Sequence, residues 1–367
     1  MSSTEHHVAT VEPAGARRHQ NALVWHGRRD VRVDRRAVPS GLPADWVRIE
    51  VAWCGVCGSD VAEYLQGPIA LGFAAGAERQ VVLGHETSGV VVAAHGDQSL
   101  VGRRVVTDTL ISCGHCPACR RGDVNLCPEL IVSGFTSDGG LAQFVDVPSD
   151  TCFVVPDAVG LDLAALSEPL AVAVRAVDRA RLASPGQVVI VGLGAVGLML
   201  AVLLGPARAV GVDPVSSRRQ QAGRIAGLQT YADVAELPPA ADTPWTAFEC
   251  TGKMAALDAV IHHAPANGTI VLVGAHTNST SVDLHRFLHS ELVMMATLSH
   301  SRQDTGTALS ILAAAPDRFA GLVTHRVRLD DAPTVLRALA EPDTPVVKAL
   351  IGPAGRPWAD VPAPDVA

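Results

Sequence analysis

The chain has 367 residues, of which 48% are hydrophobic and 18% are charged, and its formal net charge is −8 at pH 7. A chain of this length and apolar content typically folds into two domains, each with its own core. The mildly acidic balance, without a dense block of Lys and Arg, excludes nucleic acid as an expected partner.

The two ends of the chain show no structural pattern. Residues 1–20 are polar and lack the apolar core of a signal peptide, so we expect a flexible tail and a cytoplasmic protein. Residues 355–367 are rich in Pro, Ala and Asp, and we expect a second flexible tail there. No membrane partner is expected, because the uncharged run at 188–207 contains spaced glycines and Pro206, which favour a buried strand followed by a buried helix.

Short strands separated by glycine-rich turns fill the first part of the chain, from about residue 21 to about residue 156. Strands are expected at 46–52, 89–93 and 104–106. Residues 163–181 contain few helix breakers and are expected to form a helix. This pattern predicts a β-rich domain that ends in a helix.

Strands and helices then alternate. The expected strands are apolar runs at 188–191, 209–212, 245–249, 269–273 and 293–296, and helices are expected between them, notably at 194–204 and 217–226. Apolar strands alternating with helices predict a parallel, doubly wound sheet covered on both faces. Strand character returns at 323–329 and 346–350, around a helix at 331–340, and this last part is expected to pack on the first domain.

A G-x-G-x-x-G motif directly follows the first strand of the alternating region. It comprises Gly192, Gly194 and Gly197, with Ala195 and Val196 between the last two. In this context the first glycine permits a tight turn, the second lets the backbone approach a pyrophosphate, and the third lets the helix pack on the strand. The helix N-terminus then attracts the phosphates, so the motif predicts a dinucleotide site.

The identity of the dinucleotide is indicated by Asp213, which follows the second strand of this region. A carboxylate at this position accepts hydrogen bonds from the ribose hydroxyls and repels a 2′-phosphate. We therefore expect NAD rather than NADP. Arg218 and Arg219 lie five and six residues later and can contact phosphate or adenine, so this preference is not absolute.

Four cysteines are spaced C-x2-C-x2-C-x7-C, at Cys113, Cys116, Cys119 and Cys127. Thiolates at this spacing can surround one tetrahedral ion, and a closed four-sulfur set suits a structural zinc that staples a loop. The spacing is not that of a ferredoxin iron–sulfur cluster. A nucleic-acid zinc ribbon would require a basic surface, which is missing.

A second set of soft and acidic ligands consists of Cys57, His85, Glu86 and Glu168. A mixed Cys, His and carboxylate set leaves one position open for water or substrate, as a catalytic zinc requires. Cys54 forms a C-x-x-C with Cys57, which also permits a redox-disulfide interpretation.

Five segments in this order resemble the zinc-containing medium-chain dehydrogenases: GVCGSD at 55–60, GHE at 84–86, the four-cysteine segment, SEPLA at 167–171 and VGLGAVG at 191–197. The segments EYLQGPI at 63–69, SDGGLA at 137–142 and THR at 324–326 are similar to the 2,3-butanediol and sorbitol dehydrogenase branch. The resemblance implies an α/β protein with a GroES-like β-rich catalytic domain, at 21–180 and 317–354, and a Rossmann NAD-binding domain at 181–316.

The resemblance also implies the site roles. Cys57 and His85 are expected to hold the catalytic zinc, and Glu86 and Glu168 are the carboxylates that alternate between direct and water-mediated coordination. The hydroxyl of Ser59 would relay the alcohol proton. The implied activity is zinc-dependent hydride transfer between a secondary alcohol or its ketone and NAD, with about two zinc ions per chain, in a homodimer or homotetramer.

Three departures from the family pattern bear on the substrate. Ala62 stands where the family often has the outer histidine of the proton relay, Arg103 replaces an aspartate, and Arg175 stands where histidine is common. These changes favour a specialised polyol, cyclitol or sugar-derived alcohol as the substrate. They leave open a redox-neutral alternative, an epimerase, isomerase or lyase that recycles tightly bound NAD.

Overall fold

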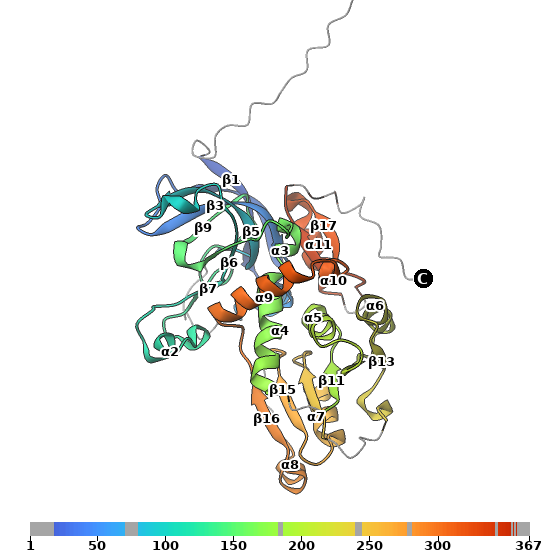
Figure 1. Cartoon of the computed structure of the whole chain (residues 1–367). Helices are drawn as coiled ribbons and strands as arrows, with labels where there is room; N and C mark the ends of the chain where they lie inside the picture. Colours follow the sequence, from blue (N-terminus) through green and yellow to red (C-terminus); the bar gives the residue numbers. More distant parts are fainter. Residues whose placement is uncertain are drawn as a thin grey trace, which may run out of the picture.

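The computed structural model describes residues 18–69, 80–182, 186–238, 244–276, 281–341 and 344–353, together with Gly355 and Pro357. Nearly all residues of the expected tails lie outside these ranges. The described chain forms two sheet-based halves, and the long helix α4 (Ser167–Ala180) runs between them (Figure 1).

The first half is built around strand β3 (Trp46–Gly55), whose residues Val47, Ile49 and Val51 are buried. The described residues form a seven-stranded sheet in the order β10-β6-β5-β3-β18-β17, with β9 also paired to β3. Its other strands are β5 (Glu86–His95), β6 (Arg104–Thr107), β9 (Phe144–Pro148), β10 (Cys152–Val154), β17 (Val323–Val327) and β18 (Lys348–Ile351). A smaller sheet has the order β2-β1-β4, with β1 (His19–Gly27), β2 (Asp30–Ala37) and β4 (Val81–Val82).

The end of the chain returns to this first sheet. Strand β18 pairs antiparallel with β3, with Leu350 opposite Gly55. Helix α11 (Ala332–Leu339) packs its buried residues Val335 and Leu336 into the same core as β3. This arrangement brings residues near position 348 next to residues near position 56.

The second half is a six-stranded sheet in the order β13-β12-β11-β14-β15-β16, in which every pair is parallel. Its strands are β11 (Val188–Val191), β12 (Ala209–Val212), β13 (Gln229–Tyr231), β14 (Thr246–Glu249), β15 (Thr269–Leu272) and β16 (Val293–Ala296). From β11 the chain first adds β12 and β13 on one side and then β14, β15 and β16 on the other, so the strand order reverses between β11 and β14. Ligands of such sheets bind at the carboxyl ends of the strands beside this point.

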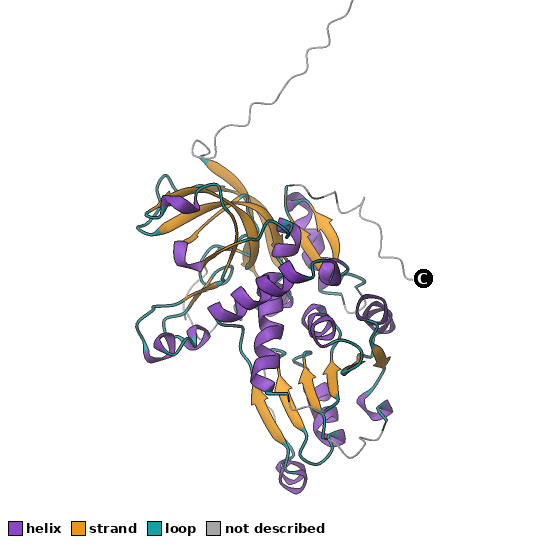
Figure 2. Cartoon of the chain, in the orientation of Figure 1, coloured by secondary structure: helices purple, strands orange, loops and turns teal. Residues whose placement is uncertain are grey.

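Helices cover both faces of this sheet (Figure 2). On one face α4, α5 (Ala195–Leu204), α6 (Ser216–Ala226) and α9 (Arg302–Ala314) contribute to a core that includes Ile190 and Phe248. On the other face α7 (Met254–His263) and α8 (Leu284–Ser290) pack near Val189 and Ala247. The predicted fold class, a GroES-like β-rich half with a doubly wound parallel-sheet half, is confirmed.

One predicted element is wrong in detail. The expected helix at 163–181 is two helices, α3 (Leu161–Ala164) and α4, which begins at Ser167. The cause is Pro169, because proline lacks an N–H and its ring clashes with the carbonyl four residues earlier, so it fits only in a first turn. The run at 188–207 is a buried strand and helix, as predicted, and none of the described helices is long and apolar enough to cross a membrane.

Candidate metal and dinucleotide sites

The sheet of the first half brings three of the predicted metal ligands together. Cys57 directly precedes helix α1 (Gly58–Gln66), and His85 and Glu86 lie where β5 begins. Because Gly55 on β3 pairs with Glu86 on β5, these segments are adjacent. The ligand atoms of Cys57, His85 and Glu86 all lie within 4.8 Å of one another, close enough to hold one metal ion.

The surroundings of His85 fit a metal ligand. Its Nδ1 lies 3.4 Å from Oδ1 of the fully buried Asp60, and its Nε2 lies 3.2 Å from the Ser59 hydroxyl. A histidine that ligates a metal through one nitrogen characteristically has a carboxylate at the other, which fixes its orientation. The other oxygen of Asp60 accepts the N–H of Cys57 at 2.8 Å, so one carboxylate orients two ligands.

Glu86 is paired with a lysine that the sequence analysis did not single out. Lys348 on β18 donates to both Glu86 oxygens, at 2.6 and 2.8 Å, and to the carbonyl of Val56 at 3.1 Å. Both side chains of the pair are at most 1% exposed. Burial lowers the pKa of Lys348, but the Glu86 carboxylate outweighs it and raises that pKa above its usual range. A lysine within an apolar strand is a signal of a buried partner.

Glu168 lies in the first turn of α4 and is not part of the set of mutually close ligand atoms. Its Oε1 lies 3.3 Å from Nε2 of His300, a residue with no exposed surface. Burial alone would lower the pKa of His300, but Glu168 and Asp108 raise it to about 9. Sequence reasoning missed His300, because it belongs to no motif.

The four cysteines of the C-x2-C-x2-C-x7-C segment lie around a common centre. The sulfur atoms of Cys113, Cys116, Cys119 and Cys127 all lie within 4.8 Å of one another. The N–H of Cys119 donates to Cys116 Sγ and that of Cys113 donates to Cys127 Sγ, each at 3.4 Å. All eight cysteines are free thiols, and this arrangement suits a closed tetrahedral ion. We call residues 113–127 the cysteine lobe.

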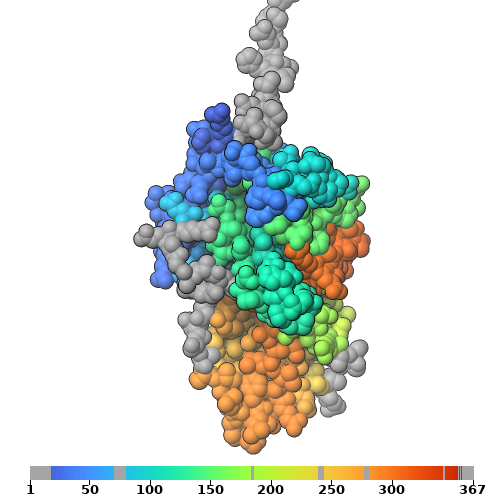
Figure 3. Space-filling model, turned by 90° about the vertical axis from the view of Figure 1, so that its left-hand side faces the viewer, coloured from blue at the N-terminus to red at the C-terminus, as the bar shows by residue number. Residues whose placement is uncertain are grey.

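The cysteine lobe is attached to the second half of the molecule. Figure 3 shows it, in green, on the surface where the first half meets the orange segments of the second half. The side-chain amide of Asn125 donates to the carbonyl of Leu298 at 2.7 Å. Arg175 on α4 lies 3.8 Å from Asp123 in the lobe and 3.3 Å from Asp304 on α9. Arg175, a departure from the family pattern, therefore joins three segments.

The glycine motif forms the loop between strand β11 and helix α5. Gly192 takes a φ of +93°, which L side chains rarely adopt. A Cβ at Gly197 would lie 1.9 Å from the carbonyl oxygen of Gly192, whereas a Cβ at Gly194 would meet nothing within 4 Å. The loop is thus closed on its packed side and open where Gly194 caps helix α5, with the N–H groups of Ala195 and Val196 in the first turn.

Asp213 connects this loop to the end of β12. Its two carboxylate oxygens accept the N–H groups of Leu193 and Val215, at 2.8 and 2.9 Å, and the residue is buried. Each oxygen keeps a second lone pair, so a further hydrogen bond is chemically possible. Arg218 lies 3.8 Å from Asp213 and Arg219 donates to the Asp213 carbonyl.

One cavity of about 190 Å³ joins the two predicted sites. Its lining includes Cys57 and Gly58 from the metal-ligand segment, Gly194, Ala195 and Arg218 from the dinucleotide segment, and Lys348. A metal held by Cys57 and a dinucleotide held by the glycine loop would therefore meet in a shared space.

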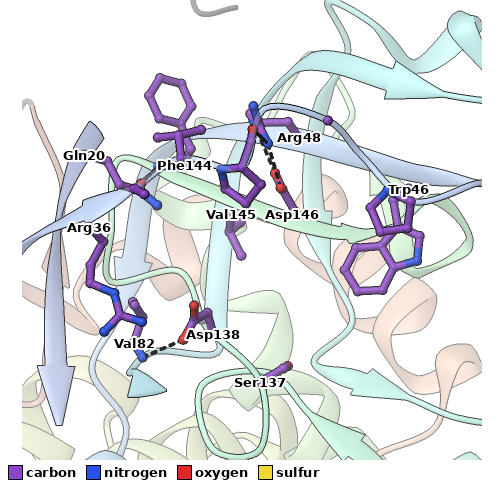
Figure 4. Close-up of a pocket in the computed structure, with 16 residues that line it drawn as sticks. Gln20, Arg36, Trp46, Arg48, Val82, Ser137, Asp138, Phe144, Val145 and Asp146 are labelled. Carbon is purple, nitrogen blue, oxygen red and sulfur yellow. Dashed lines mark hydrogen bonds and ion pairs between the residues drawn. The ribbon is translucent and has the colours of Figure 1, made fainter. Parts of the chain in front are cut away.

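A larger hollow of about 510 Å³ lies elsewhere and contains none of the predicted site residues (Figure 4). Its charged side chains mainly form hydrogen bonds and ion pairs with neighbouring strands of the fold. Arg48 forms two 2.7 Å bonds with Asp146, and Asp138 accepts the N–H of Val82 at 3.0 Å. We therefore place the functional site at the smaller cavity.

Comparison with known proteins agrees with this geometry. The family model of the alcohol dehydrogenase GroES-like domain matches residues 43–157, and that of the glucose dehydrogenase C-terminus matches residues 161–351. A sorbitol dehydrogenase of Bacillus subtilis is 31% identical over 69% of this chain and 74% of its own length. An (R,R)-butanediol dehydrogenase of Neisseria gonorrhoeae is 28% identical over 84% and 92%.

A solved structure extends the likeness to three dimensions. The 2R,3R-butanediol dehydrogenase of Bacillus subtilis has a TM-score of 0.79 and 27% identity, covering 91% of this chain and 99% of its own. These relatives are dehydrogenases, which does not favour the redox-neutral alternative. With a cysteine lobe, a Cys/His/Glu set and a glycine loop on the same two-part fold, the chain belongs to the zinc-containing, nicotinamide-dependent medium-chain alcohol dehydrogenases, in the branch of the sorbitol and butanediol dehydrogenases.

Proposed function

We propose that this protein transfers a hydride between a secondary alcohol of a polyol and NAD, with the alcohol being a vicinal diol, a cyclitol or a sugar-derived alcohol. The observation that carries the proposal is the cavity shared by Cys57 and the glycine loop at Gly194 and Ala195. When bound there, zinc supplies a Lewis acid that lowers the pKa of the alcohol, and NAD supplies the hydride acceptor.

The residues of the chain hold and orient the ligand set. Cys57, His85 and Glu86 are the proposed zinc ligands, since their ligand atoms lie within 4.8 Å of one another. Asp60 fixes the ring of His85 and the backbone of Cys57. Burial raises the pKa of the Glu86 carboxyl, and the ammonium of Lys348 opposes this rise by favouring the ionised form.

The Ser59 hydroxyl is the proposed first acceptor of the alcohol proton. It lies on the first turn of α1, 3.2 Å from Nε2 of His85 and therefore next to the ligand set. Ala62, one turn further along α1, has no group that can carry the proton onward. Because Ser59 is partly exposed, we propose that solvent receives the proton from its hydroxyl directly.

The proposed cofactor contacts follow the glycine motif. Gly192, Gly194 and Gly197 shape the loop, and the first-turn N–H groups of α5 at Ala195 and Val196 face the pyrophosphate. Asp213 accepts a ribose hydroxyl, and Arg218 lies on the cavity wall beside it. This arrangement favours NAD over NADP, because a 2′-phosphate would meet the Asp213 carboxylate.

The domain boundaries, assembly and location are also proposed. We assign 21–180 and 317–354 to the catalytic domain and 181–316 to the Rossmann domain. A homodimer or homotetramer is supported by β16, which pairs only with β15 among the described strands and exposes Val293 and Met294 by 48% and 39%. A cytoplasmic location is supported by eight unpaired cysteines, as expected in a reducing compartment.

Incubation of the purified protein with NAD and a panel of vicinal diols, polyols and cyclitols tests the proposal. NADH is followed by absorbance and products are identified by mass spectrometry. Accumulation of NADH with one group of alcohols supports net hydride transfer and defines the substrate class. Product that forms without any net NADH contradicts the proposal and favours the redox-neutral alternative.

A further inference from the structure

The buried residue His300 contacts Glu168, the predicted zinc-ligand carboxylate that lies outside the Cys57, His85 and Glu86 group. Nε2 of His300 lies 3.3 Å from Oε1 of Glu168, and neither residue is more than 6% exposed. Cys57, His85 and Glu86 form a mutually close group without Glu168. The Glu168 carboxylate therefore forms an ion pair with this imidazole and lies outside the mutually close metal-ligand group.

The ring of His300 is fixed from its other side. Its Nδ1 lies 3.2 Å from the Thr305 hydroxyl and 4.0 Å from Oδ1 of Asp108, and all three residues are buried. Thr305 belongs to helix α9, whose N-terminus is capped by Ser301 and Asp304. The ring therefore has a hydrogen-bond partner at Nδ1 and an acidic neighbour at Nε2, and turning it would separate it from both.

The backbone that carries His300 is fixed as well. The carbonyl of Leu298 accepts the Asn125 amide at 2.7 Å, and the carbonyl of Ala296 accepts Nε of Arg179 at 2.8 Å. The position of His300 is thus set by the cysteine lobe and by α4, the helix that also carries Glu168. Histidine and carboxylate are held in one rigid frame.

We propose that His300 is a positioning residue that holds the Glu168 carboxylate beside, and not on, the zinc bound by Cys57, His85 and Glu86. The inference rests on the proposed function of that site. An unrestrained Glu168 would add a second carboxylate and fill the position that a substrate oxygen needs, because a catalytic zinc site requires an open position. His300 therefore keeps the site open.

Cobalt substitution tests this inference with a readout other than activity. Co²⁺ replaces zinc, and its visible spectrum changes when one of its ligands is exchanged for another. The spectrum of the Cys57→Ser variant, which keeps the cysteine lobe alone, is subtracted to isolate the Cys57 site. The variants are His300→Leu, which removes the donor, and His300→Gln, which keeps an amide donor. A third, Thr305→Val, removes one support of the ring with little change in volume.

We expect His300→Leu to shift the visible spectrum of the Cys57 site while metal content stays unchanged, because Glu168 would take the open position, and His300→Gln to retain the spectrum of the unaltered protein. Thr305→Val should shift the spectrum in the same direction by a smaller amount, which also serves if His300→Leu fails to fold. In a Glu168→Gln background, His300→Leu should have no further effect, since the tethered carboxylate is gone. kcat should fall with His300→Leu while KM for NAD is unchanged.

An unchanged spectrum in both His300→Leu and Thr305→Val would overturn the role of His300 and leave the proposed function intact. An effect of His300→Leu that persists in the Glu168→Gln background would overturn it too, because His300 would then act through another group. If the unaltered protein shows no thiolate-to-cobalt absorption dependent on Cys57, the proposed metal site fails, and the role of His300 fails with it.

Discussion

The ammonium group of Lys348 lies 2.6 and 2.8 Å from the two carboxylate oxygens of Glu86, and the two side chains are almost completely buried. These residues are 262 positions apart and meet because β18 returns to the sheet that contains β3 and β5. The ion pair joins the last strand of the chain to the proposed zinc ligand. The pairing places a positive charge next to a carboxylate of the proposed zinc site.

Replacing one member of this pair should lower the stability of the fold more than replacing both members. Lys348→Met leaves the Glu86 charge buried and unpaired, which costs about 3–5 kcal/mol. We expect a clear fall in the thermal midpoint of the zinc-free protein, measured by differential scanning fluorimetry. The double variant Lys348→Met/Glu86→Gln should recover part of it. Equal midpoints for Lys348→Met and the unaltered protein would contradict a buried ion pair.

Metal content should distinguish Cys57 from its neighbour in the C-x-x-C. Cys57→Ser should lower the zinc content from about two to about one per chain and abolish turnover, because an open three-ligand site depends on each ligand. Cys54 is fully buried and outside the ligand set, so Cys54→Ala should keep both ions. Elemental analysis by mass spectrometry gives the ratio. A loss of zinc from Cys54→Ala alone would reverse the assignment.

Thiol labelling should divide the cysteines into two groups. After zinc removal by a chelator at neutral pH, we expect iodoacetamide to modify Cys57 and also Cys119, because burial is outweighed by hydrogen bonds from Ser112 and Cys116, which lower the pKa of the Cys119 thiol to about 6. Cys54 and Cys152 should stay unmodified, because burial raises the pKa of each thiol to about 12 and reaction requires the thiolate. Peptide mass spectrometry locates the modified residues. Rapid modification of Cys54 in the folded protein would contradict this division, because it would show that Cys54 is accessible to the reagent.

Cofactor preference should depend on the charge of Asp213. Asp213→Asn keeps an oxygen for the Leu193 N–H but removes the charge opposed to a 2′-phosphate. Loss of a charge-assisted hydrogen bond, about 1.5–3 kcal/mol, predicts a rise of about tenfold or more in the NADP-to-NAD ratio of kcat/KM. Adding Arg218→Ala should cancel much of this rise. An unchanged ratio in Asp213→Asn would remove Asp213 from the ribose site.

Proton release should be sensitive to buffer, because Ala62 cannot continue a relay from Ser59. Added imidazole should raise kcat of the unaltered protein where proton release limits the rate. Ala62→His should raise kcat by about tenfold or more without added imidazole, within the range of general acid–base effects, and should make the rate independent of imidazole. A rate that ignores imidazole in both proteins would indicate another proton path.

Several strands of this structure can be predicted closely from the local sequence pattern. The strands β11, β12 and β16 have the predicted bounds, because an apolar run between turn residues is a local signal. Helix α1 was not predicted, since it begins after Cys57 with a glycine and is only nine residues long. Helix α9 was also not predicted, although Ser301 and Asp304 form a recognisable capping box.

The residues of the site also fall into two groups, those that local motifs predict and those that depend on distant contacts. Cys57, His85 and Glu86 lie in recognisable motifs, and the structure brings them together. Lys348 and His300 act only through partners that are distant in the sequence, Glu86 and Glu168, and no local pattern encodes such a pairing. Predicting these residues requires knowledge of which strands and helices meet.

The attachment of residues 296–305 to both halves has a consequence for protein engineering. This short segment links β16 to α9, and it contacts the cysteine lobe through Leu298 and Glu168 through His300. A chimera that exchanges the dinucleotide-binding half with that of a relative therefore needs its second junction before Ala296, so that the segment remains with its original partners. A junction placed after α9 would replace residues 296–305 with those of the relative. Asn125 and Glu168 would then lose their native partners Leu298 and His300.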